Sequence, residues 1–149
     1  MKRVRMLVLL TALAVMLLMP TASSEAGPQE TMMSKVNSWR NSHGLRGVRT
    51  SGALAGSARR YAARMMQSGY FGHSSRIQAS GSWRRLGEVL YLRYGTGAAT
   101  TSAFRSWLRS GSHRSIIAHR GFSHAGAGYV TGRFRGRKAT IWVMQFGHP

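Results

Sequence analysis

The chain of 149 residues has no cysteine and no aspartate, and its only acidic residues are Glu25, Glu30 and Glu88. A disulfide framework is therefore impossible, and a lipoprotein anchor is excluded because it needs a cysteine. No aspartate exists to orient a histidine for nucleophilic catalysis, so Glu88 would have to serve in that role. A small domain of this composition must depend on packing for its stability.

A long membrane-spanning run is also missing. Lys2, Arg3 and Arg5 precede an apolar stretch over residues 6–19, which Pro20 ends. This stretch has about 14 residues, whereas a membrane span needs about 20. Small residues follow, and they permit cleavage before Glu25 or before Gly27. We therefore expect a signal peptide over residues 1–26, one domain over residues 27–149, no transmembrane segment after cleavage, and a secreted or cell-envelope-associated protein.

Positive charge is abundant, with 22 lysines and arginines and a formal net charge of +19. Cleavage before Gly27 removes three cationic residues and one glutamate, which leaves +17. A chain of this charge gathers on anionic surfaces. For an exported protein we expect anionic cell-envelope polymers or lipids as partners, and no nucleic acid. Arginine enrichment from biased genome composition, with no partner at all, is the alternative.

The hydrophobic periodicity predicts helices followed by a hairpin, which is an α+β protein with helices on a small antiparallel sheet. The expected helices cover residues 28–43, 51–68 and 96–109, with one more turn around Ile116 and Ile117. Residues 88–94, 127–133 and 138–146 are expected to be extended, with a turn over residues 135–137. Residues 45–49 and 70–87 are expected to be a connector and a loop.

Three residues stand out as candidates for chemistry: His73, Glu88 and His113. Two imidazoles and one carboxylate form a ligand set that zinc accepts. Their spacings of 15 and 25 residues match no local metal motif. Glu88 could instead form a salt bridge to Arg84 or Arg85, or bond to backbone amides. The histidines could likewise be helix-end or surface residues.

Several segments, in order, resemble motifs of the CAP superfamily, whose domain is also called SCP. They are residues 36–45 (VNSWRNSHGL), 70–74 (YFGHS), 87–90 (GEVL), 107–117 (WLRSGSHRSII), 127–129 (AGY) and 142–147 (WVMQFG). The similarity runs over residues 32–147 and is greatest to the short bacterial branch without disulfides.

This resemblance implies a three-layer α-β-α sandwich. We separately expect a monomer. The resemblance also implies a cleft lined by His73, Glu88 and His113, which in relatives can hold a divalent metal, often zinc. Many relatives carry a second cleft glutamate near the end of the third helix, and residues 107–113 contain no acid. Val89 also stands where an amide is common.

Three functions remain open from the sequence. The first, which we prefer, is a secreted binding module for a lipid, a sterol or an anionic wall polymer, assisted by a metal. The second is a metal-dependent hydrolase in which metal-bound water is the nucleophile. The third is a cationic effector that acts on membranes by charge, without any need for Glu88 or the histidine pair.

Overall fold

The computed structural model describes residues 26–149. The expected signal peptide, residues 1–26, lies outside the described residues except for Ala26. The elements in chain order are α1 (Pro28–Ser42), β1 (Arg49–Thr50), α2 (Gly52–Ser68), β2 (Arg85–Tyr94), α3 (Thr100–Arg109), α4 (Gly111–Ile117), β3 (His124–Phe134) and β4 (Arg137–His148). None of these helices combines the length and the apolar character that a membrane crossing requires.

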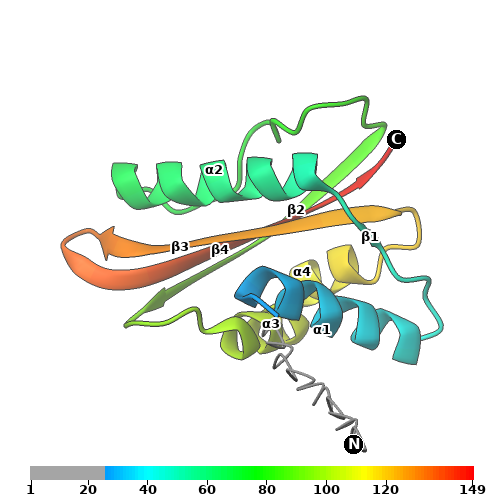
Figure 1. Ribbon diagram of the computed structural model, residues 1–149, viewed down its shortest axis with the longest axis horizontal. Coiled ribbons are helices and arrows are strands. Elements are labelled where there is room, and N and C mark those ends of the chain that lie inside the picture. The colour runs from blue at the N-terminus through cyan, green and yellow to red at the C-terminus, as the bar shows by residue number, and fades with distance from the viewer. Residues whose placement is uncertain (1–25) are drawn as a thin grey trace, which may run out of the picture.

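The elements form three layers. The sheet has the strand order β1-β3-β4-β2, with α2 on one face and α1, α3 and α4 on the other (Figure 1). Strands β2, β3 and β4 pair in antiparallel fashion. The architecture confirms the expected α+β class and the α-β-α sandwich.

Each face of the sheet has its own core, because successive strand side chains point to opposite faces. Val89, Trp142 and Met144 pack toward α1, α3 and α4. Leu90, Ile141 and Val143 pack toward α2. Most of β4 is buried on both faces, which accounts for the nearly continuous apolar run over residues 139–146.

Two expectations about the elements were wrong in detail. The sheet is mixed, because Arg49–Thr50 pairs in parallel with β3, although this part of the chain was expected to be a connector. The third helix begins at Thr100, four residues later than expected. Gly97 and Ala99 have positive φ angles of 83° and 53°, so the backbone before Thr100 cannot be helical.

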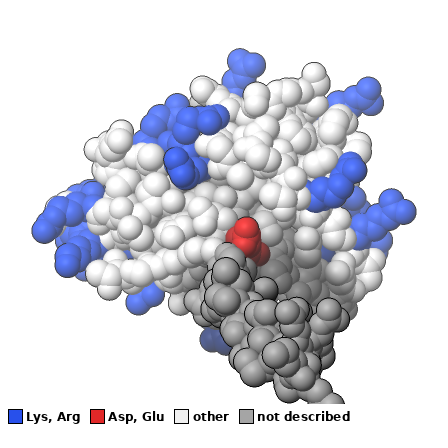
Figure 2. Space-filling view, viewed as in Figure 1, with Lys and Arg blue, Asp and Glu red and all other residues white. Residues whose placement is uncertain are grey.

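Charge on the described surface is almost entirely positive. Residues 26–149 contain 19 lysines and arginines but only two acidic side chains, Glu30 and Glu88. Glu88 is buried. Figure 2 shows Lys and Arg side chains around the rim of one face, with a single acidic side chain visible.

Candidate functional site

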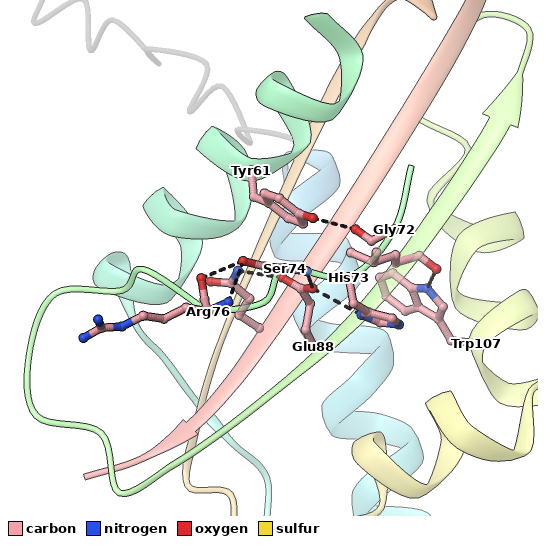
Figure 3. Close-up of polar contacts among 9 residues, drawn as sticks. Tyr61, Gly72, His73, Ser74, Arg76, Glu88 and Trp107 are labelled. Atoms are coloured by element: carbon pink, nitrogen blue, oxygen red, sulfur yellow. Dashed lines mark hydrogen bonds and ion pairs between the residues drawn. The ribbon is translucent and has the colours of Figure 1, made fainter. Parts of the chain in front are cut away.

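Glu88 lies on β2, the strand at the edge of the sheet, and is only 5% exposed. It pairs across the strands with Gln145, whose Nε2 donates to Glu88 Oε2 over 2.9 Å. Glu88 Oε1 accepts from the backbone N–H of Ser74 at 3.1 Å and from His73 Nδ1 at 3.2 Å (Figure 3). The carboxylate therefore has three donors around it, and none of them is Arg84 or Arg85.

His73 lies in the loop that follows α2, and that loop is fixed at two points. α2 ends at Gly69 in the left-handed conformation, with φ of 67°, which turns the chain toward β2. Tyr61 on α2 then donates its hydroxyl to Gly72 O over 2.6 Å (Figure 3). These contacts hold His73 beside Glu88 while 56% of its side chain stays exposed.

His113 comes to the same place from the opposite layer. It lies on α4, whose first turn is capped by the Ser110 hydroxyl. The rings of His113 and His73 are 6.0 Å apart between centroids, in an edge-to-face arrangement. The two layers meet here because β2 is an edge strand with no further strand beyond it. Burial, and then the neighbouring His73, lowers the pKa of His113, which favours the neutral imidazole that a metal requires.

Of these three residues, the two histidines have the spacing of imidazoles that could hold one metal ion together. Two imidazoles that share one zinc ion through Zn–N bonds of about 2.1 Å place their ring centroids about 5 to 6 Å apart. The bond from His73 Nδ1 to Glu88 leaves His73 Nε2 free to ligate. Glu88 accepts three hydrogen bonds, two at Oε1 and one at Oε2. Within residues 26–149, no cluster of three or more His, Cys, Asp or Glu side chains has an arrangement suited to a metal ion.

An open cavity of about 740 Å³ lies beside His73. Its wall combines aromatic rings from Tyr61 and Tyr70 with cationic side chains from Arg64 and Arg76. Tyr70 is 58% exposed, which is unusual for a large ring on this protein. The cavity therefore presents both flat apolar surface and positive charge to a ligand.

The serines near His73 are not arranged for nucleophilic attack. The Ser74 hydroxyl donates to Arg76 O over 2.6 Å, which turns it away from His73. The Ser112 hydroxyl lies 3.1 Å from that of Ser110. Neither makes the hydrogen bond to a histidine on which acyl transfer by a serine depends.

The other four histidines lie away from this cleft. His43 stacks on Trp39 at the end of α1, with ring centroids 4.0 Å apart. His119 accepts from the backbone of Gly121 just after α4. His124 and His148 both contact the hydroxyl of Ser123, at 2.9 and 3.0 Å.

Two residues of the site, Gln145 and Tyr61, were not predicted from the sequence. Gln145 is the one polar side chain in the apolar run of residues 141–146, and this isolation was a usable signal. Its NH2 faces Glu88, which leaves Gln145 Oε1 buried without a hydrogen-bond partner among the described residues. Tyr61 gave no such signal, because its ring fits the apolar face of an amphipathic helix.

A family model described as CAP, the cysteine-rich secretory protein family, matches residues 33–146. A search of curated proteins found no match. Among solved structures, an extracellular protein containing an SCP domain from Bacillus anthracis str. Ames is similar, at 18% identity and a TM-score of 0.67. The match covers 83% of this chain but only 41% of that protein, so this chain spans less than half of its length.

Two further structures share the fold. An outer surface protein from Borrelia burgdorferi has 17% identity and a TM-score of 0.64, over 79% of this chain and 90% of its own. NaASP2, whose crystal structure was determined with Zn²⁺, has 14% identity and a TM-score of 0.62, over 81% of this chain and 80% of its own. At these identities the likeness establishes the fold.

Proposed function

This chain belongs to the cysteine-rich secretory protein (CAP) family, and from that we propose that it is a secreted module that binds an anionic cell-envelope polymer in the cleft beside His73, with a divalent metal on His73 and His113. The observation that carries the proposal is the convergence of His73, Glu88 and His113 from three separate elements. A buried carboxylate placed to orient one of two neighbouring imidazoles supports a binding role for this group.

Secretion is supported by the N-terminal pattern, a cationic start followed by a short apolar run and small residues. The Bacillus anthracis relative is described as extracellular, which agrees with this assignment. The proposed mature domain is residues 27–149, and we propose that it acts as a monomer.

The cavity beside His73 favours an anionic polymer over a sterol. Arg64 and Arg76 offer charge-assisted hydrogen bonds to acidic groups, and the rings of Tyr61 and Tyr70 can stack on the flat faces of sugars. A sterol needs a deep apolar pocket, whereas this cavity is open and lined by charged groups. A metal on the two imidazoles would supply a positive centre for an oxygen of the ligand.

The test is zinc binding by the purified protein, measured by titration calorimetry above about pH 7, where imidazoles are neutral. We expect one zinc ion per chain, and a loss of affinity of about 100-fold or more in a His73→Ala, His113→Ala double variant. Glu88→Gln should cost about tenfold, because it acts on the metal through His73.

The matched control is a His43→Ala, His119→Ala double variant, which removes two imidazoles outside the cleft and should bind zinc as the wild type does. Full zinc retention in the His73, His113 variant would overturn the metal site. A protein that acts by charge alone would bind anionic polymer equally in both variants and lose that binding as salt is raised.

A further inference from the structure

A second hollow, of about 520 Å³, is lined by four arginines, and no part of it belongs to the cleft beside His73. Its wall carries Arg46, Arg49, Arg85 and Arg120, together with Ser123 and His148. No acidic side chain lines it. We call this the arginine pocket.

The arginine pocket is assembled from segments far apart in the chain. Arg46 comes from the loop after α1, Arg49 from β1, Arg85 from the start of β2, and Arg120 from the loop after α4. The guanidinium of Arg85 lies against Gly121, where any Cβ would overlap its Nη1 and would lie 3.0 Å from its Cζ. The absence of a side chain at Gly121 thus makes room for Arg85.

A buried arginine behind the wall holds the two loops together. Arg40 is completely buried on α1, and its Nε donates to Arg46 O over 2.8 Å. Its Nη1 donates to Ile117 O at 2.6 Å and His119 O at 3.2 Å. The loop that carries Arg46 is therefore fixed to the segment that leads to Arg120. These hydrogen bonds fix the backbone at two of the four segments that contribute arginines to the pocket.

Positive charge in the pocket is not balanced by the protein. The one ion pair within residues 26–149 joins His73 to Glu88, so none of the four arginines has a carboxylate partner. Burial, and then the charges of Arg49 and His148, lowers the pKa of the adjacent His124. Like charges that line one pocket repel one another, and an anion bound among them would reduce that repulsion.

We propose that the arginine pocket binds the phosphate group of a phosphate ester. Guanidinium groups present donors in a planar fork that matches phosphate oxygens, and a tetrahedral phosphate can accept from several forks at once. The group could belong to a phosphate polymer of the cell envelope or to a lipid headgroup, since the recognising chemistry is the same. This proposal does not depend on the function proposed for the cleft.

The first experiment titrates the purified protein with inorganic pyrophosphate at a fixed ionic strength near 0.15 M, where long-range attraction is screened. An Arg85→Gln, Arg120→Gln variant should bind at least about tenfold more weakly than the wild type. The matched control, Arg59→Gln with Arg105→Gln, removes the same charge from exposed positions on α2 and α3 and should change affinity less than about twofold. A second pocket variant, Arg46→Gln with Arg49→Gln, should show the same loss of affinity and tests the pocket if the first variant fails to fold.

Two further measurements with the same variants identify the source of the phosphate. One uses a soluble glycerol phosphate oligomer, and the other uses phosphatidylglycerol vesicles against phosphatidylcholine vesicles. The source of the phosphate is identified by the probe, oligomer or phosphatidylglycerol vesicle, for which the pocket variants lose at least tenfold more affinity than the control variant does. Equal losses in pocket and control variants, with all probes, would show that net charge alone binds the anion and would overturn the proposal.

Discussion

At the scale of single residues, Arg40 is the least expected feature of the molecule. Its guanidinium is fully buried, yet its partners are the carbonyls of Arg46, Ile117 and His119 rather than a carboxylate. Burial lowers its pKa, but an arginine stays protonated at neutral pH. A buried charge is tolerated here because three peptide dipoles surround it.

We predict that Arg40→Met lowers the free energy of unfolding by about 3 kcal/mol, because three carbonyls lose a charged donor. Arg40→Lys should lower the free energy of unfolding by less, because it keeps the positive charge. It should still be less stable than the wild type, because one ammonium group cannot reach both loops. Urea unfolding measures both changes. The control is Arg59→Met on the exposed side of α2, with an expected change within about 0.5 kcal/mol. An Arg40→Met protein as stable as the wild type would contradict this role.

The sequence named the candidate site residues but not their hydrogen-bond partners. His73, Glu88 and His113 could be named because family motifs surround them, and the structure brings them together. The way Glu88 orients His73 depends on hydrogen bonds that the spacing of the residues in the sequence does not reveal. The bond of Glu88 to Gln145 joins residues 57 positions apart, and only the register between β2 and β4 brings them face to face.

At the scale of elements, the contact of α2 with β3 depends on two glycines. A Cβ at Gly126 or Gly128 would collide with the backbone of Ala55 or Arg59 in α2. The strand expected over residues 127–133 includes Gly128, but the sequence could not show the helix that packs on it. The start of α3 was missed for a similar reason, since Gly97 O is held by the Thr140 hydroxyl on β4, a contact across 43 residues.

We predict that Gly128→Ala destabilises the protein by about 3 kcal/mol, because α2 must move away from the sheet to admit one methyl group. Gly52→Ala is the matched control, since a Cβ there meets nothing within 4 Å at the first position of α2. It should be neutral or stabilise by up to about 1 kcal/mol. Thermal and urea unfolding provide the measurement. Equal changes in the free energy of unfolding for the two substitutions would show that the close approach of Gly128 to α2 does not limit the packing.

At the scale of the whole molecule, charge sets the conditions under which the fold is stable. Residues 26–149 carry 19 cationic side chains against two acidic ones, so the charges of the folded protein repel one another at neutral pH. The α+β class was predictable because hydrophobic periodicity survives this bias, whereas the three-layer sandwich was implied by the family resemblance. The grouping of four arginines in one pocket was not, since they come from separate loops and strands.

The last prediction concerns acid stability and follows from His124. Burial and the charges of Arg49 and His148 lower its pKa in the folded protein below the ordinary 6.5. As pH falls below about 6.5, the unfolded chain therefore takes up this proton before the folded chain does, and stability is lost until pH passes the folded value. We expect the melting temperature to fall between pH 7 and pH 5, and less steeply in His124→Asn, whose amide can keep the bond to Ser123. A control with His43→Asn should follow the wild-type slope, and an unchanged slope in His124→Asn would assign the acid sensitivity to other groups.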